Sequence, residues 1–183
     1  MSASAGASFH AESFSARRFL WRVIGRPLFR MTYHNWNPVR RFILRLFGAT
    51  LDSTTKLRNS VMIDCPWNLS AGRLTVIGDA AVLRTKQPVT IGERCVISQY
   101  AMVTSFMRDP YDEKHRVTAA PITIEDDCWV ATDALVLPGS KIHAGTVVGA
   151  RSLVDGELPG WSIATGEPAE PRAARELKAD STS

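Results

Sequence analysis

The stretch that decides the fold runs from residue 124 to residue 154 and reads IEDDCWVATDALVLPGSKIHAGTVVGARSLV. An amphipathic helix would need apolar spacings of three and four, and an isolated strand a period of two. The period here is six, which predicts an all-β fold: a parallel β-helix of hexapeptide repeats, with three hexads in each triangular coil. The aliphatic residue of each hexad is Ile124, Val130, Val136, Ile142, Val148 or Val154, and the small residue at the fifth position is Cys128, Ala134, Ser140, Thr146 or Ser152.

The same rhythm runs earlier in the chain, in groups that start twenty residues apart. These groups are Leu51, Leu57 and Ile63; Ala71, Ile77 and Leu83; and Ile91, Ile97 and Val103. Two additional residues in each early coil predict a bulge at one corner, at Leu69-Ser70 and near Pro88-Val89. Between Val103 and Ile124 the spacing is 21 residues, which predicts a loop at about residues 104–121 that leaves the coils. Long loops on a compact scaffold are usually functional or disordered.

The segments that flank the repeat are expected to cap it. Residues 1–48 are predicted to form a helical extension, residues 49–170 the β-helix, and residues 171–183 a short helix and a tail. Residues 19–24 and 39–47 mix apolar and basic side chains with helical spacing, separated by Pro27 and by a turn at residues 35–38. Two roles for this N-terminal segment remain open: it covers the first coil, or it makes weak contact with a membrane surface.

Composition narrows the class of protein. Lys and Arg exceed Asp and Glu by only 22 to 18, so no nucleic-acid partner is predicted. No apolar run approaches the roughly 18 residues that a membrane span requires. The three cysteines form no CxxC pattern, which favours a reducing, cytoplasmic location, and Cys95 and Cys128 are expected to be buried filler.

Several stretches resemble the colanic acid biosynthesis acetyltransferase group within the hexapeptide-repeat O-acetyltransferases. The resemblance covers roughly Trp36 to Arg172 and implies a left-handed β-helix and a homotrimer with active sites in the clefts between subunits. It also implies acetyl-CoA as co-substrate and a saccharide-type acceptor, as in surface polysaccharide biosynthesis. The stretches that carry it are Pro66-Trp67-Asn68-Leu69, Val89-Thr90-Ile91-Gly92, Ala120-Pro121-Ile122-Thr123-Ile124 with Trp129, Val147-Val148-Gly149-Ala150-Arg151-Ser152, and Gly166-Glu167-Pro168-Ala169.

The sequence departs from this family at the catalytic position. The family reads approximately Thr-Gly-Ser-His-Asp-Tyr before its loop, and the register places Arg108 at the histidine, followed by Asp109 and Pro110. Arginine stays protonated in proteins and cannot be a general base. Arg108 is therefore a candidate for holding an anionic acceptor, while a trimeric β-helix that has lost catalysis and serves as a scaffold or a CoA- or sugar-binding module remains the alternative function.

His115 and Asp109 are the candidate bases. His115 lies in the predicted loop, where Asp112 or Glu113 could orient it, although an exposed loop histidine with no catalytic role is the competing interpretation. Asp109 could accept the acceptor's proton only if burial raised its pKa.

The other predicted site residues contact the two substrates. Trp129 and Asn68 are the acceptor-site candidates, and Trp129 could instead pack beneath the loop. No metal is expected, because a carbonic anhydrase built on the same prism needs three histidine ligands and only His115 and His143 lie in the coil region. The acetyl-CoA candidates are Ala131, Gly149 and Ala150, which would let a pantetheine arm approach the backbone, and Arg151 and Arg172, which could meet phosphates.

Overall fold

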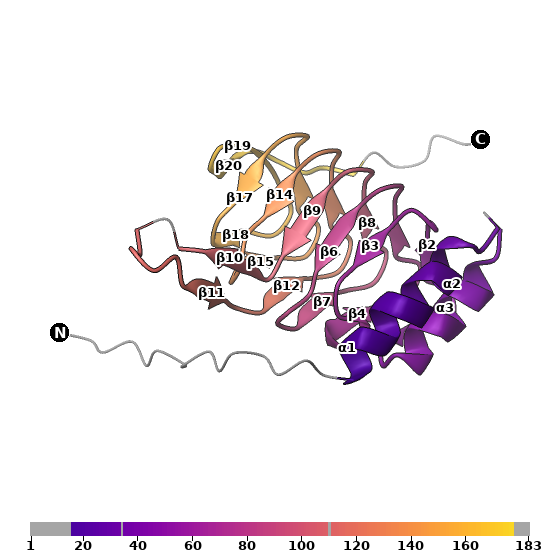
Figure 1. The fold of residues 1–183 in the computed structure, drawn as a ribbon. Coiled ribbons are helices and arrows are strands. Elements are labelled where there is room, and N and C mark those ends of the chain that lie inside the picture. Colours follow the sequence, from indigo (N-terminus) through magenta and orange to yellow (C-terminus); the bar gives the residue numbers. More distant parts are fainter. Residues whose placement is uncertain (1–15, 34, 110, 178–183) are drawn as a thin grey trace, which may run out of the picture.

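The computed structural model describes residues 16–33, 35–109 and 111–177, and most of them form a triangular prism of stacked coils (Figure 1). Each coil contributes one short strand to each of three faces, so strands from successive coils pair in parallel. Face 1 comprises β1 (Thr50–Leu51), β4 (Leu69–Ala71), β7 (Val89–Ile91), β12 (Ile122–Ile124), β15 (Lys141–Ile142) and β18 (Glu157–Leu158).

The other two faces follow the same stacking order. Face 2 comprises β2 (Lys56–Leu57), β5 (Val76–Ile77), β8 (Val96–Ile97), β13 (Trp129–Val130), β16 (Val147–Val148), β19 (Ser162–Gly166) and β20 (Ala169–Ala174). Face 3 comprises β3 (Met62–Ile63), β6 (Val82–Arg84), β9 (Met102–Thr104), β14 (Leu135–Val136) and β17 (Leu153–Val154).

The aliphatic residues of the hexads form the core, as the sequence predicts. On face 1, Ile124 lies between Ile91 of β7 and Ile142 of β15, and all three are at most 2% exposed. Burying an aliphatic side chain of this size contributes about 1.5–3 kcal/mol. Because every coil repeats this burial at each face, the stacked aliphatic residues hold the prism together.

The small fifth residue of each hexad closes a corner against the next coil. Thr75 donates from Oγ1 to the carbonyl oxygen of Gly92 at 2.7 Å, and Thr146 donates to that of Pro159 at 2.7 Å. The prediction that Cys95 and Cys128 are buried is confirmed, since they are 0% and 1% exposed. A larger side chain would displace the aliphatic residues that fill the narrow prism.

The additional residues of the early coils lie slightly before the predicted bulges. Leu69 and Ser70 belong to strand β4, and the surplus is taken up by the 3-10 turn η2 (Pro66–Asn68). Residues 85–88 likewise form the corner before β7, which contains Val89. The surplus falls at the corner because the strands must keep their register for the core residues to stack.

The N-terminal helices lie at one end of the prism: α1 (Ala16–Leu20), η1 (Trp21–Gly25), α2 (Arg26–Arg30) and α3 (Asn37–Leu46). Trp21 is 1% exposed and donates from Nε1 to the carbonyl oxygen of Ile63 at 2.9 Å, which fixes η1 on the first coil. Pro27 does not separate two helices as expected, because it occupies the first turn of α2, where its missing N–H is tolerated. Among the described residues no helix is long and apolar enough to cross a membrane.

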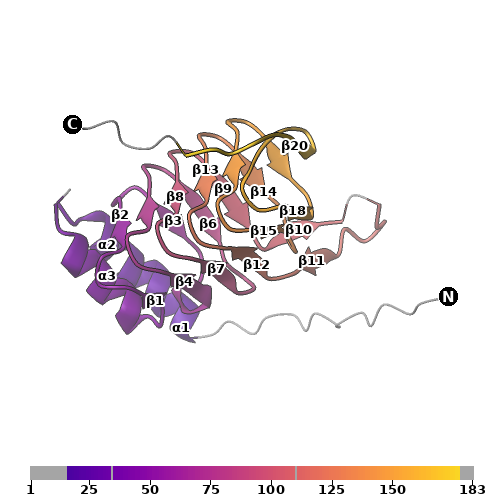
Figure 2. The ribbon, with the colours of Figure 1, turned by 180° about the vertical axis from the view of Figure 1, so that it is seen from behind.

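The predicted loop is largely a hairpin of β10 (Phe106–Arg108) and β11 (Val117–Ala119), which projects from the corner between faces 3 and 1 in both views (Figures 1 and 2). The predicted C-terminal helix is wrong. Residues 169–174 form β20, which pairs antiparallel with β19, and residues 175–177 are not helical. The exposed backbone groups of β19 offer hydrogen bonds to this segment, and pairing with them overrides the local helix preference of the alanines. Residues 178–183 lie outside the described residues.

Candidate active site

The hairpin gathers the three residues predicted for catalysis. Arg108 ends β10 opposite Val117, and the backbone N–H of Asp109 donates to the carbonyl oxygen of Arg116 at 2.9 Å. Arg108 donates from Nη1 to the carbonyl oxygen of His115 at 3.3 Å. The structure therefore brings Arg108, Asp109 and His115 to one end of the same hairpin.

The carboxylates near His115 are engaged elsewhere. Asp112 accepts hydrogen bonds from the N–H of Lys114 at 3.0 Å and from Nε of Arg116, and the Arg116 guanidinium lowers the pKa of this carboxyl. Asp109 accepts from the N–H of Tyr111 at 2.9 Å. His115 is exposed, and no described residue forms a hydrogen bond with its ring. The expected orientation of His115 by Asp112 is therefore not present in this chain alone.

The residues predicted for acetyl-CoA line a different corner, between faces 2 and 3. Ala131 follows β13 and Gly149 follows β16, and their stacking is set by the pairing of Val130 with Val148. The N–H of Ala131 donates to the carbonyl oxygen of Val148 at 2.9 Å. These two small residues therefore lie one above the other along the corner.

The small size of Gly149 has a structural reason in the next coil. A Cβ atom at this position would lie 2.6 Å from Cγ2 of Thr165. Ala150 and Arg151 are exposed at the same corner, and Nε of Arg151 lies 3.5 Å from Oδ2 of Asp133. Arg172 lies on β20, with Nη2 3.2 Å from Oε2 of Glu170. Both arginines thus have exposed guanidinium groups with one carboxylate neighbour.

The two acceptor-site candidates are held by hydrogen bonds. Trp129 is 45% exposed on face 2 and donates from Nε1 to Oγ of Ser98 at 2.9 Å. Asn68 donates from Nδ2 to the carbonyl oxygens of Thr85 and Lys86 at 2.9 and 2.8 Å. Asn68 therefore ties two successive corners together, because both hydrogens of its amide are directed at the backbone of the next coil.

The predicted residues form two separate groups in one chain. The hairpin leaves the corner between faces 3 and 1, whereas Ala131 and Gly149 mark the corner between faces 2 and 3. One prism cannot fold its own two corners onto each other, because the stacked coils fix them. A site that uses both groups needs the hairpin of one chain to meet the other corner of a second chain.

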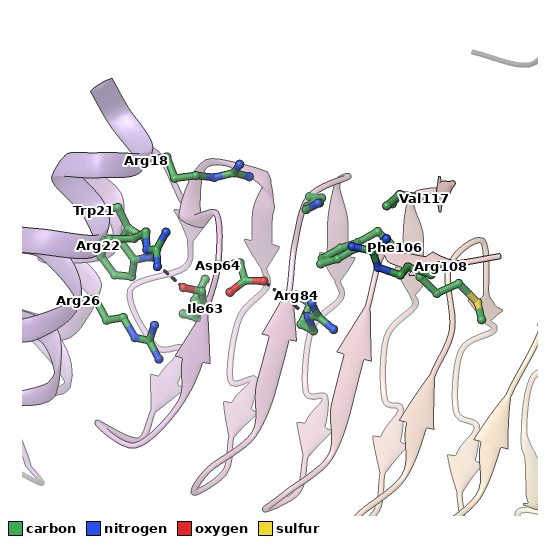
Figure 3. A pocket seen from close by; sticks show the side chains of 12 residues that line it. Arg18, Trp21, Arg22, Arg26, Ile63, Asp64, Arg84, Phe106, Arg108 and Val117 are labelled. Atoms are coloured by element: carbon green, nitrogen blue, oxygen red, sulfur yellow. Dashed lines mark hydrogen bonds and ion pairs between the residues drawn. The ribbon is translucent and has the colours of Figure 1, made fainter. Parts of the chain in front are cut away.

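A cavity of about 520 Å³ lies beside the base of the hairpin, and sequence reasoning missed most of its residues. It is bounded by η1, the corner between faces 3 and 1, and β10 (Figure 3). The sequence signal was the four-residue spacing of Arg18, Arg22 and Arg26, which places three arginines on one side of the helical segment. Among the described residues no group of three or more His, Cys, Asp or Glu is arranged to hold a metal ion.

The outward side chains of the prism differ between faces, which sequence reasoning also missed. Face 1 carries a polar column, whereas the columns of faces 2 and 3 are apolar except for Lys56 on β2. The sequence signal for this difference was the type of residue, polar or apolar, that directly precedes each buried aliphatic residue of a hexad. The outward residues are Thr50, Ser70, Thr90, Thr123, Lys141 and Glu157 on face 1; Lys56, Val76, Val96, Trp129, Val147 and Ile163 on face 2; and Met62, Val82, Met102, Leu135 and Leu153 on face 3.

The chain is similar in sequence and in fold to known acetyltransferases. The chain is 39% identical over 155 residues to WcaF of Escherichia coli (strain K12), assigned to colanic acid biosynthesis as an acetyltransferase, and the match covers 82% of each chain. Among solved structures, the hexapeptide-repeat acetyltransferase VCA0836 from Vibrio cholerae superposes with a TM-score of 0.82 at 22% identity, covering 92% of this chain and 96% of that one. A galactoside acetyltransferase in complex with coenzyme A superposes with a TM-score of 0.80 at 20% identity, covering 87% and 81%.

No protein-family model matches the chain. The solved structures establish the fold as a left-handed parallel β-helix, and the identity to WcaF over most of both chains establishes the relationship. The stacked hexads, the interrupted coil with its hairpin and this sequence identity agree with one another. The chain therefore belongs to the colanic acid biosynthesis acetyltransferase group of the hexapeptide-repeat acetyltransferases.

Proposed function

We propose that this protein is an acyl-CoA-dependent O-acetyltransferase that transfers an acetyl group to a hydroxyl of a saccharide-type acceptor in surface polysaccharide biosynthesis. The observation that carries the proposal is the hairpin, which leaves the prism where one coil is interrupted and places His115 and Asp109 beside Arg108. The relationship to WcaF supports the reaction class and the pathway, and a galactoside acetyltransferase with the same fold binds coenzyme A.

Acetyl transfer needs a base because an alcohol is a weak nucleophile near pH 7. A neutral imidazole of His115 would take the proton of the acceptor hydroxyl while its oxygen attacks the thioester carbonyl of acetyl-CoA. Collapse of the tetrahedral intermediate forms the ester and releases the CoA thiolate. Arg108 cannot take the proton, but its guanidinium can hold a negatively charged group of the acceptor.

Acetyl-CoA is proposed to lie along the corner of Ala131 and Gly149. The small side chains leave room for a pantetheine arm to approach the backbone. Arg151 and Arg172, which are exposed, are proposed to contact the phosphates of the nucleotide, and Trp129 to border the acceptor. Asn68 is proposed to support the acceptor site indirectly, because its side chain holds the corner of the prism in place by hydrogen bonds to the backbone of the next coil.

The test is thiol release from acetyl-CoA in the presence of a panel of acceptor sugars. We expect CoA release above the acceptor-free rate with at least one acceptor. The proposal fails if the native protein releases no CoA with any acceptor while the Arg108→His form gains turnover, because the scaffold would then be competent and the native residue would have abolished the reaction.

The second candidate function is a trimeric β-helix that has lost catalysis and acts as a scaffold or a CoA- or sugar-binding module. The observation in its favour is that the ring of His115 has no hydrogen-bond partner among the described residues, while the family resemblance aligns Arg108 with the position of the base. Saturable acetyl-CoA binding without transfer would favour a binding module. Absence of both would favour a scaffold.

A homotrimer is proposed because each chain carries the two groups of site residues at different corners of the prism, so that they can meet only between chains. The apolar outward columns of faces 2 and 3 support it, since extended apolar surface on a soluble domain usually marks an interface. Val96 and Trp129, for example, are 39% and 45% exposed in one chain. Packing one chain's face 2 near another's face 3 would bury both columns and bring a hairpin to the acetyl-CoA corner.

We also propose a cytoplasmic location, with weak contact to an anionic membrane surface through the N-terminal helices. Leu20, Ile24 and Leu28 on α1, η1 and α2 form a stripe with Met31, which directly follows α2, and these four residues are 45–81% exposed. Arg18, Arg22 and Arg26, each two residues from an apolar position of the stripe, lie on the opposite side of these helices, where they face the cavity. A helical segment with one apolar side and one basic side is typical of helices that lie in a membrane interface.

A further inference from the structure

The cavity beside the hairpin is strongly cationic. Six of its lining residues carry a positive side chain, and a single acidic residue, Asp64, faces them. The cations are Arg18, Arg22, Arg26, Arg84, Lys86 and Arg108. From this charge and its geometry we propose that the cavity binds the diphosphate group of a diphosphate-linked saccharide, which is the acceptor of the acetyl group. This inference rests on the proposed transferase function.

The cavity walls hold two cations in fixed positions. Phe106 is 8% exposed, with Cζ of Arg84 4.3 Å and Nζ of Lys86 4.2 Å from its ring centroid. Nε of Arg84 also lies 3.7 Å from Oδ2 of Asp64. Contact with the ring restricts both side chains, so less conformational entropy is lost when a ligand binds between them.

The helical wall contributes arginines whose charge is not neutralised within the described residues. Arg22 and Arg26 make no side-chain hydrogen bond or ion pair with any described residue. Figure 3 shows Arg18, Arg22 and Arg26 on the helical side, across from Arg84 and Arg108. The buried Trp21 fixes this wall through its hydrogen bond to Ile63, so the two walls keep their separation.

The number of cations favours a diphosphate over a single carboxylate. One carboxylate would neutralise one charge and satisfy one bidentate guanidinium contact, whereas a diphosphate offers two charges and several acceptor oxygens to separate donors. A concave, cationic site of this kind also concentrates anions by its field. The predominance of arginine over lysine fits recognition of phosphate oxygens.

Arg108 connects this cavity to the candidate catalytic hairpin. It lines the cavity and also donates to the carbonyl oxygen of His115. A diphosphate between Arg22, Arg26 and Arg84 would place the attached sugar toward the hairpin. The arginine that the resemblance aligns with the family's histidine therefore has a role in this proposal: it extends the anion site to the acceptor end.

The first experiment measures binding of inorganic pyrophosphate to the full chain by titration calorimetry, without acetyl-CoA and with a saturating concentration of it. We expect saturable binding in both cases. The double variant Arg22→Gln, Arg26→Gln should weaken it by at least roughly tenfold, as expected for the loss of charged hydrogen bonds. Arg30→Gln is the matched control, because Arg30 is exposed on α2 and does not line the cavity.

Two further ligands distinguish the sources of the diphosphate. UDP-glucose represents a nucleotide-linked sugar, and farnesyl diphosphate in detergent micelles represents a lipid carrier. The ligand that binds more tightly than pyrophosphate to the native protein, and loses that affinity in the double variant, shows whether the diphosphate belongs to a nucleotide or to a lipid carrier. Either result supports the diphosphate site.

The proposal is overturned if pyrophosphate does not bind saturably, if Arg30→Gln weakens binding as much as the double variant, or if acetyl-CoA displaces pyrophosphate. The last outcome would assign the cavity to the diphosphate of the co-substrate. Binding without CoA release from acetyl-CoA would leave the site standing and reject the transferase function. If the native protein does not bind pyrophosphate and the double variant turns over a neutral sugar at an unchanged rate, the diphosphate site is rejected. The transferase function then stands.

Discussion

Arg108 and His115 are linked by one hydrogen bond, from Nη1 of the arginine to the backbone carbonyl oxygen of the histidine, 3.3 Å away. The contact spans the end of the hairpin and leaves the imidazole ring exposed and without a hydrogen-bond partner among the described residues. Arg108, which the family resemblance aligns with the catalytic histidine, therefore holds the backbone that carries His115, the candidate base of this hairpin.

His115→Ala should lower kcat for acetyl transfer by about 10²–10⁴-fold, the usual contribution of a general base. The measurement is CoA release with an acceptor that the native protein uses. Lys114→Ala is the matched control, because it removes an exposed neighbour of the same hairpin end and should leave kcat unchanged. Equal rates for the native protein and His115→Ala would show that His115 is not the base.

Leu135→Asp should dissociate the proposed trimer. Leu135 is an outward residue of face 3, and burying a carboxylate in an apolar interface is costly. Sedimentation velocity should show a shift from trimer to monomer. Thr90→Asp places the same charge on the polar face 1 and should leave the trimer intact. A native protein that sediments as a monomer at all concentrations would contradict the proposed assembly.

Ile97→Ala should lower the free energy of unfolding by about 2–5 kcal/mol, because the side chain is 0% exposed in the prism and the coil cannot collapse to fill the gap. Urea denaturation at a fixed protein concentration measures the change. Ile24→Ala removes the same atoms from a side chain that is 48% exposed, and its effect should stay within about 0.5 kcal/mol. Equal effects of the two substitutions would argue against the observed core.

His143 should make stability depend on pH. Its ring contacts the carboxylates of Glu157 and Glu125, and the hydrogen bond to Glu157 is the main cause of its raised pKa, against the opposing effects of desolvation and of the Lys141 charge. Because the folded pKa is raised, this contribution is fully present below the unfolded value of about 6.5 and is lost as pH rises through the folded pKa.

Glu157 and Glu125 determine the pH below which the contacts of His143 no longer stabilise the fold. The pKa of Glu157 is lowered mainly by His143 and that of Glu125 mainly by the N–H of Ala144, so their stabilisation is lost as pH falls through those depressed values. The difference in thermal midpoint between the native protein and His143→Gln should therefore be largest between about pH 5 and 6 and should shrink toward pH 9. A difference that grows toward pH 9 would contradict this assignment.

Leu20→Asp with Ile24→Asp should reduce sedimentation with vesicles that contain anionic phospholipid, because the apolar stripe would carry charge into the interface. Arg73→Gln, an exposed arginine that pairs with Glu93 on the prism, should not reduce it. If the native protein stays in the supernatant with these vesicles, the helices do not bind such membranes.

The sequence by itself determined the prism. An aliphatic residue at every sixth position, as in Ile124 and Val130, can be buried together only if the chain turns at fixed intervals, so local spacing specifies the coil. The interruption after Val103 likewise located the hairpin, and the family resemblance located Arg108 within it. These features depend on short separations along the chain, which a single sequence displays directly.

The tertiary structure decided the remainder. Residues 169–174 carry a helix-like composition, but the free edge of β19 makes them a strand. The cationic cavity brings Arg22, Arg84 and Arg108 together from segments more than twenty residues apart, and no spacing predicts that meeting. The same holds for the separation of the hairpin from the corner of Gly149, because the rigid stacking of coils, rather than any motif, fixes the two corners apart.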